Sequence, residues 1–374
     1  MKILIAGDFA PQSRIYKLIS KKEYSKIFTN ELRSIIKSSD FSFVNLESPI
    51  IESAYKPIPK CGPNLHCTCE TAEAIKYAGF SCVTMANNHI LDFGAAGLNK
   101  SKESLKKHGL KIVGIGDNIK EAERILYLKK GECILAVINC CENEFSIATS
   151  SSPGANPLNP IHQYYAIQEA KRHANYVLVI VHGGHEHFQL PSLRMVETYR
   201  FFIDAGADAV VNHHQHCFSG YEEYNSKPIF YGIGNFCFDS NPTKINNNWN
   251  YGYMVELHFG DNVGYKIHPY NQCGEEPTIQ MLENSVFDKT VSKLNDIIAD
   301  HTQLDIKLKE YYCMGEKYEN FCLEPYSGKI YEKLFSISML PTFVSGKKAS
   351  FILNHINCES HRDKLIFALK RKNK

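Results

Sequence analysis

The chain has 374 residues, 44% hydrophobic and 22% charged, which is enough apolar sequence for a substantial core and argues against disorder. Its formal net charge of +2 provides no general attraction to nucleic acid or membranes, so we expect no nucleic-acid partner. Thirteen cysteines are an odd number without the spacing of a disulfide framework, so we expect reduced thiols in a cytoplasmic protein.

Short apolar stretches alternate with helical patterns from Met1 to about Asn212. The first apolar run, Ile3–Ala6, predicts a buried strand and is much shorter than the ~18 residues of a transmembrane helix. Apolar residues at helical spacing predict a helix over Glu23–Lys37. Further strands are expected over Phe41–Leu46, Phe80–Ala86, Lys111–Val113, Ile134–Asn139, Tyr176–Val181 and Ala209–Val211. Further helices are expected over Thr71–Ala78, Ala95–His108, Tyr164–Ala174 and Leu193–Ala205. This alternation predicts an α/β fold.

The pattern changes near Tyr221. Hairpin-like strands are expected over Tyr221–Tyr224, Ile229–Ile233, Tyr253–His258 and Tyr265–Pro269. The remaining sequence is mixed and polar, with helices expected near Asp288–Ile298 and Cys358–Ala368. We therefore predict a main domain over residues 1–277 and a C-terminal elaboration, residues 278–374, that packs on or beside it.

Polar side chains gather where five predicted strands end. They are Asp8; Asn45 and Glu47; Asn88 and His89; His182, His185 and Glu186; and Asn212, His214 and His216. In open α/β sheets, ligands bind at the carboxyl ends of the strands. A single loop histidine is more often a hydrogen-bonded polar residue than a ligand. Five such groups together favour a metal site, because imidazoles and carboxylates bind transition metals and paired ions can activate water.

Six motifs occur in a characteristic order. They are Gly7-Asp8, Asn45-x-Glu47, Asn87-Asn88-His89 with Asp92, His182 with Gly184 and Glu186, His214-x-His216, and Gly234-Asn235-Phe236. Over residues 1 to about 239 this order resembles the CapA family of capsule and poly-γ-glutamate biosynthesis proteins. The resemblance implies a calcineurin-like metallophosphatase sandwich, with two β-sheets flanked by helices and one to two divalent transition metals (Mn, Zn or Fe) between strand-end loops.

The resemblance also implies individual roles. The implied metal ligands are Asp8 and His216 on a first ion, Asn88, His182 and His214 on a second, and Glu47 bridging both. The implied catalytic residues are His89 as an acid, Asp92 orienting it or fixing the start of a helix, and Glu186 as a hydrogen-bond partner of a metal ligand or as a substrate contact. Candidates for substrate binding are Asn45, His185 and Asn235. Phe9-Ala10 follow Asp8 where the wider superfamily carries a histidine, so the first ion should bind less tightly or be open to water and substrate.

Two classes of function fit this pattern. The resemblance implies a metal-dependent, phosphoesterase-like hydrolase acting on a small-molecule or polymer-precursor substrate of the cell envelope, in capsule or other polymer biosynthesis. An amide hydrolase or transferase on the same site is an alternative, and so is a non-catalytic metal- or polymer-binding accessory protein. His89 favours an enzyme, because holding a metal ion does not require it.

Two other features are weaker candidates. Cys61, His66, Cys67 and Cys69 could suggest structural zinc, but they lack paired Cys-x-x-Cys spacing, and free thiols are favoured. The basic C-terminal tail, residues 364–374, could touch an anionic membrane surface, although a solvated helix end is the simpler interpretation.

Overall fold

The computed structural model describes residues 1–52, 54–60, 62–239, 247–283, 285–314 and 329–337, together with residues 339, 352 and 356. The chain divides into two compact units, Met1–Ile306 and Lys307–Lys374. No helix in the described ranges is long and apolar enough to cross a membrane. The expected domain boundary after residue 277 stays a prediction. Cys61, the helix expected near Cys358–Ala368 and the basic tail lie outside the described residues.

The first sheet of the larger unit has the strand order β16-β15-β14-β1-β2-β3-β4, with β13 paired beside β1. Its strands are β1 (Lys2–Phe9), β2 (Phe41–Leu46), β3 (Cys82–Thr84), β4 (Lys111–Val113), β13 (Asn235–Cys237), β14 (Tyr251–Phe259), β15 (Val263–Gln272) and β16 (Ile279–Met281). Strands β1 to β4 run parallel, whereas β14, β15 and β16 are antiparallel to their neighbours. Strand β1 is buried from Ile3 onward, as expected for a central strand covered on both faces.

The second sheet has the order β11-β12-β10-β9-β7-β6. Its strands are β6 (Leu126–Lys130), β7 (Cys133–Cys141), β9 (Tyr176–His182), β10 (Ala209–His213), β11 (Tyr221–Tyr224) and β12 (Lys227–Phe230). Strands β7, β9, β10 and β12 run parallel, and the edge strands β6 and β11 are antiparallel. Strands β5 (Ile115–Gly116) and β8 (Gly154–Ala155) form a small separate pair.

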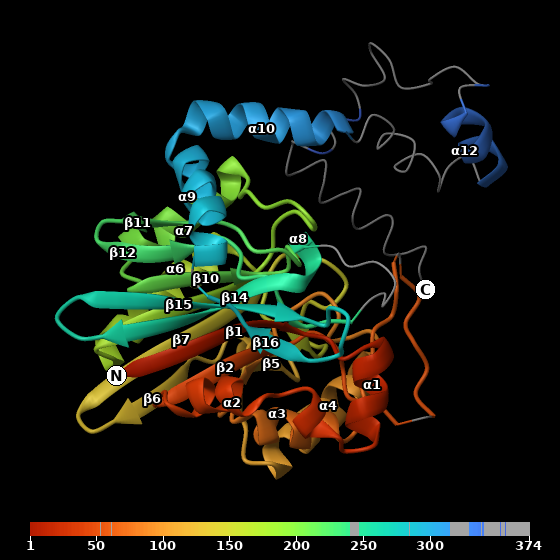
Figure 1. The fold of residues 1–374 in the computed structure, drawn as a ribbon, viewed down its shortest axis with the longest axis horizontal. Coiled ribbons are helices and arrows are strands. Elements are labelled where there is room, and N and C mark those ends of the chain that lie inside the picture. Colours follow the sequence, from red (N-terminus) through yellow and green to blue (C-terminus); the bar gives the residue numbers. More distant parts are fainter. Residues whose placement is uncertain are drawn as a thin grey trace. The chain divides into compact units, whose positions relative to one another are not determined.

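Helices cover the outer faces of the two sheets. The helices of the larger unit are α1 (Ser13–Ser20), the 3-10 turn η1 (Tyr24–Lys26), α2 (Asn30–Lys37), α3 (Thr71–Ala78), α4 (Gly94–Lys107), α5 (Ile119–Ala122), α6 (Pro160–His173), α7 (Leu193–Asp204), α8 (Asn247–Asn250) and α9 (Ser285–Ala299). Helices α2 and α4 contact the first sheet, and α6 and α7 contact the second (Figure 1). The expected α/β sandwich of two sheets flanked by helices is confirmed. Two further helices are α10 (His301–Met314) and α12 (Lys329–Ser336).

Local sequence explains one helix boundary that periodicity missed. The single helix expected over Glu23–Lys37 is wrong, because η1 and α2 are separate elements. The side chain of Thr29 accepts a hydrogen bond from the backbone N–H of Leu32 at 3.3 Å and so starts α2. Apolar periodicity runs through this break because both pieces bury residues, Tyr24 in η1 and Ile36 in α2.

Candidate metal centre

Strand β1 brings Asp8 to the middle of the site. Asp8 is in register with Asn45 on β2 and with Asn235 on β13. This approach requires a glycine at position 7, because a Cβ atom there would lie 1.8 Å from the carbonyl oxygen of Gly234. The neighbouring backbone N–H of Asp8 donates to that same carbonyl at 3.3 Å. Contact between β1 and β13 therefore fixes where the Asp8 carboxylate projects.

Glu47 follows β2 and is fully buried. Its Oε1 lies 3.3 Å from Nε2 of His182 and 3.7 Å from Nε2 of His216. Neither carboxylate oxygen has a hydrogen-bond partner among the described residues. Burial, followed by the charge of Asp8, raises the pKa of Glu47 well above its ordinary value. A buried carboxylate that lacks donors and faces imidazoles is satisfied by a cation, so the residues present fit a metal ion.

His182, Asn88 and His214 form one side of the cluster. Nε2 of His182 lies 3.1 Å from Oδ1 of Asn88 and 3.1 Å from Nδ1 of His214. Burial, and then the charge of His214, lowers the pKa of His182 well below its usual value, so its imidazole is neutral. One ligand atom each of Glu47, His182 and His214 lies within 4.8 Å of the others. A neutral imidazole offers the lone pair that a metal needs.

Asp8 and His216 form the other side. One ligand atom each of Asp8, Glu47 and His216 also lies within 4.8 Å of the others. Oδ1 of Asn235 lies 2.9 Å from Nδ1 of His216, and the Asn235 amide donates to the backbone carbonyl of His216 at 3.0 Å. With its Nδ1–H directed at Asn235, the His216 ring presents Nε2 toward Glu47. Burial lowers the pKa of His216 to about 4, which keeps the ring neutral.

The backbone of the last two ligands is unusual. His214 has a φ of 85° and His216 a φ of 55°, a region that non-glycine residues seldom occupy. Such a conformation costs about 1–3 kcal/mol per residue and persists where the surrounding structure enforces it, commonly at functional sites. Here it accompanies two imidazoles that both reach the cluster around Glu47.

The structure adds His213, which sequence reasoning did not select. Its Nδ1 lies 3.3 Å from Oδ1 of Asp8. The amide of Asn45 donates to the same oxygen at 2.8 Å. Burial alone would raise the pKa of Asp8, but the close approach of the His213 ring and the charges of His213 and His182 hold it below its ordinary value. His213 ends β10, and that position was its only sequence signal. Asn45, a candidate for substrate binding, is buried and engaged with Asp8.

His89 and Asp92 form a buried pair beside the cluster. Nδ1 of His89 lies 2.6 Å from Oδ2 of Asp92, the contact expected if Asp92 orients the ring. Lys60, whose side chain is 2% exposed, forms an ion pair with Asp92, and its Nζ lies 3.1 Å from Nδ1 of His89. The backbone N–H of Leu65 also donates to Asp92 at 2.7 Å. Sequence reasoning missed Lys60, because a lysine in a proline-containing loop carries no distinguishing pattern.

The loop after β9 and an aromatic group border the site. Glu186 is exposed, and one of its carboxylate oxygens lies within 4.8 Å of ligand atoms of His214 and His216. The ring of Trp249 lies 5.2 Å from that of His216 and 5.5 Å from that of His187. His185 lies on the same loop and is partly buried, and burial lowers its pKa.

The cysteine-rich loop has a structural explanation. Cys67 is buried, and its Sγ lies 3.3 Å from the carbonyl oxygen of Ser48, within hydrogen-bond distance. Burial raises its pKa to about 12, so the thiol is protonated. Among the described residues, the groups able to hold a metal do not include His66, Cys67 or Cys69. Cys67 and Cys69, the described cysteines of this loop, are free, as favoured above.

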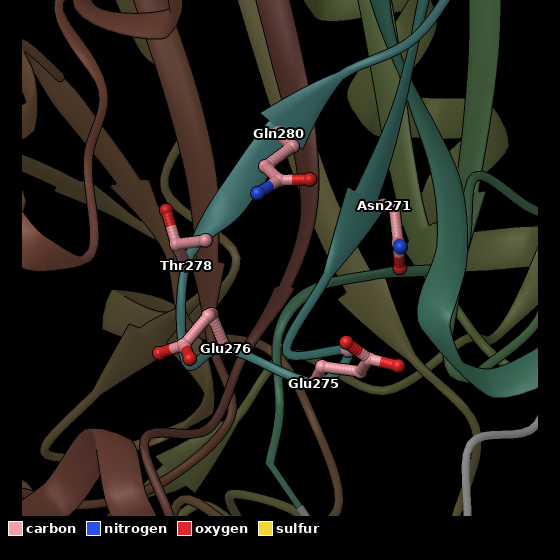
Figure 2. Close-up of a pocket in the computed structure, with 6 residues that line it drawn as sticks. Asn271, Glu275, Glu276, Thr278 and Gln280 are labelled. Atoms are coloured by element: carbon pink, nitrogen blue, oxygen red, sulfur yellow. The ribbon is translucent and has the colours of Figure 1, made fainter.

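A separate pocket of about 340 Å³ lies between β15 and β16. Figure 2 shows Asn271 on β15, Gln280 on β16, and Glu275 and Glu276 on the connection between them. Its lining contains none of the strand-end residues, so it is distinct from the candidate metal centre.

Comparison with known proteins places the chain in a family. A family model described as "Bacterial capsule synthesis protein PGA_cap" matches residues 2–240. The chain is 30% identical over 270 residues to "Capsule biosynthesis protein CapA" of Bacillus anthracis, covering 70% of this chain and 64% of that protein. It is 32% identical over 242 residues to "PGA biosynthesis protein CapA" of Bacillus subtilis, covering 64% and 63% of the two chains. The chain thus spans somewhat less than two thirds of the length of either relative.

The solved structures that match the chain are more distant in sequence. A hypothetical protein from Thermus thermophilus is 14% identical with a TM-score of 0.45, over 72% of this chain and 99% of the other. A phosphatase from Mycoplasma pneumoniae is 15% identical with a TM-score of 0.44, over 72% and 92%. The family itself is established by the sequence match, which includes all six motifs. This chain belongs to the bacterial capsule synthesis protein (PGA_cap) family.

Proposed function

We propose that this chain is a metal-dependent hydrolase of phosphoesterase type that acts in the biosynthesis of capsule or another cell-envelope polymer. The observation that carries the proposal is the convergence of ligand atoms around the unpartnered, buried carboxylate of Glu47. The names of the two Bacillus relatives, which refer to capsule and PGA biosynthesis, support the pathway. The substrate would be a small molecule or a polymer precursor of the cell envelope.

The chain's own residues have distinct tasks in this proposal. Asp8 and His216 would hold one divalent ion, and Asn88, His182 and His214 a second, with Glu47 between them. When bound, one or two ions of Mn, Zn or Fe lower the pKa of water and balance negative charge on substrate oxygens. Asn235 orients His216, since its amide oxygen lies 2.9 Å from Nδ1 of that ring.

His89 is the proposed acid toward the leaving group. With its Nδ1–H donated to Asp92, 2.6 Å away, the protonated ring would use its Nε2–H to donate to the oxygen that gains charge as the bond breaks. Lys60 pairs with the other oxygen of Asp92 and helps keep that carboxylate in place. A site that only held an ion would not need this group.

The test is elemental analysis of the purified protein, followed by a substrate panel with added manganese or zinc. The panel should contain phosphomonoesters, phosphodiesters and amides, including oligomers of γ-linked glutamate. Phosphoester turnover that a chelator abolishes is expected. Amide cleavage alone would redirect the proposal to an amide hydrolase or transferase. Bound metal without turnover on any class would instead indicate an accessory protein.

A further inference from the structure

The two ligand groups that share Glu47 are unequal. Glu47, His182 and His214, joined by Asn88 through its contact with His182, supply four side chains to one ion. Asp8, Glu47 and His216 supply three to the other. Position 10 is an alanine, so no histidine two residues after Asp8 can supply a fourth.

A third group of potential ligands lies on the exposed side. Carboxylate and imidazole atoms of Glu186, His214 and His216 lie within 4.8 Å of one another. His214 and His216 are buried, whereas Glu186 is exposed. Glu186 therefore reaches the buried cluster from the solvent side.

The backbone holds Glu186 next to these imidazoles. The N–H of His187 donates to the carbonyl of Gln215 at 2.8 Å, and the N–H of Gly183 donates to the carbonyl of His213 at 3.3 Å. These two bonds fasten the Glu186 loop to the segment that carries His214 and His216. Gly184, with a φ of 111°, makes the turn between the two donors, Gly183 and His187. The approach of Glu186 is thus built into the loop.

The negative charge of Glu186 already acts on the centre. After burial and Asp8, Glu186 is the next contributor to the raised pKa of Glu47. Glu47 and Glu186 each have a carboxylate oxygen within 4.8 Å of ligand atoms of His214 and His216, and two carboxylates that approach the same imidazoles repel each other unless a cation lies between them. A divalent ion at this point would convert the repulsion into attraction for both groups.

The third group shares both its histidines with the other two sets. An imidazole nitrogen binds one ion, so Glu186 adds a ligand to an existing ion and does not create a third site. We propose that Glu186 is the solvent-facing ligand of the ion held by Asp8, Glu47 and His216, in place of the missing histidine. The proposal rests on the proposed metal centre. It replaces the role that the sequence suggested for Glu186, a hydrogen-bond partner of a metal ligand or a substrate contact. As an exposed ligand, Glu186 is also the one that a substrate oxygen can displace.

The experiment titrates the full chain with Mn²⁺ alone and needs no substrate. Free Mn²⁺ is counted by electron paramagnetic resonance, and Trp249 is followed by fluorescence. Trp249 is the only tryptophan, and its ring lies 5.2 Å from that of His216. The variants are Glu186→Gln and Glu186→Ala. The control is Glu144→Gln, since the Glu144 charge also raises the pKa of Glu47 but Glu144 is in none of the ligand groups.

Wild-type protein should bind two Mn²⁺ ions with unequal affinity. Both Glu186 variants should lower the Mn²⁺ affinity of the weaker site by at least about 10-fold. Mutation of a residue that only hydrogen-bonds to a metal ligand already causes a loss of this size. The tighter site and both sites of Glu144→Gln should be unchanged. Wild-type affinities in both Glu186 variants would overturn the ligand role while leaving the metal centre intact. Equal weakening in Glu144→Gln would also overturn it, since charge alone would explain the effect. Absence of Mn²⁺ binding by the wild type would instead reject the metal centre itself.

Discussion

Oε1 of Glu47 lies 3.3 Å from Nε2 of His182, although one residue follows a strand of the first sheet and the other ends a strand of the second. The candidate centre is therefore built across the two sheets. Asn139 on β7 ties them together at this edge, since its side chain accepts from the backbone N–H of Ala86 at 2.9 Å and donates to the carbonyl of Ile180 at 3.0 Å. Metal affinity should therefore depend on the contact between the two sheets.

The first prediction concerns metal content. The double substitution His214→Ala and His216→Ala should remove tightly bound metal, because it takes one imidazole from each ligand group around Glu47. The sheets should stay folded, since both residues follow the end of β10. Elemental analysis and circular dichroism measure the two effects. His173→Ala, an exposed histidine on α6, is the matched control and should keep full metal content.

The second prediction concerns pH. Burial and the Asp8 charge raise the pKa of Glu47 far above 4.5, so in metal-free protein this carboxyl group is protonated below that raised pKa. His182 and His216 have lowered pKa values, about 4 for His216, and carry no proton near neutrality. Metal binding should then release about one proton, from Glu47. Apparent affinity should rise with pH up to the raised pKa of Glu47 and level off above it.

Calorimetric titration of Mn²⁺ in two buffers of different ionisation enthalpy counts the released protons. Release of no proton at a pH near 6 would show that Glu47 is already ionised.

The raised pKa of Glu47 has a second consequence, which concerns the stability of the metal-free protein. A carboxyl group whose pKa is higher in the folded state stabilises that state below the unfolded value of about 4.5, and the contribution is lost as pH rises through the folded value.

The third prediction separates catalysis from metal binding. His89→Asn should retain metal and fold but lower turnover by about 10²–10⁴-fold, the usual contribution of a positioned acid. Asp92→Asn should have a smaller effect in the same direction. Oδ2 of Asp92 lies 2.6 Å from Nδ1 of His89, and the substitution would weaken this contact, which holds the ring in its orientation. The substrate should have a poor leaving group, which depends most on protonation. Loss of metal from His89→Asn would mean that His89 is itself a ligand.

The fourth prediction tests the backbone support of Asp8. Gly7→Ala should lower the free energy of unfolding by about 1–3 kcal/mol or more, because the new Cβ would overlap the Gly234 carbonyl. Gly260→Ala is the control, since its nearest neighbour would lie 3.9 Å away, and a change within about 0.5 kcal/mol is expected. Urea denaturation measures both variants. A Gly7→Ala protein as stable as wild type would show that β1 and β13 can separate without cost.

The sequence by itself determined the strand-and-helix alternation and indicated a candidate metal site. Phe41–Leu46, Thr71–Ala78 and Lys111–Val113 were predicted with the bounds that the structure shows, because their apolar patterns are local and unambiguous. Strand ends rich in imidazole and carboxylate groups indicated a metal site, since parallel strands deliver their carboxyl ends to one edge. Both conclusions depend only on neighbours along the chain.

Only the tertiary structure decided how these groups meet. Lys60 reaches Asp92 from a loop, His213 reaches Asp8 from the other sheet, and Trp249 lies beside His216. None of these pairs has a sequence signal, because each contact is made between elements far apart along the chain. The same reason explains why the sequence suggested a catalytic role for Glu186, whereas the folded chain places its carboxylate within 4.8 Å of ligand atoms of His214 and His216. Its place depends on two backbone hydrogen bonds between loops of neighbouring strands, which no periodicity reveals.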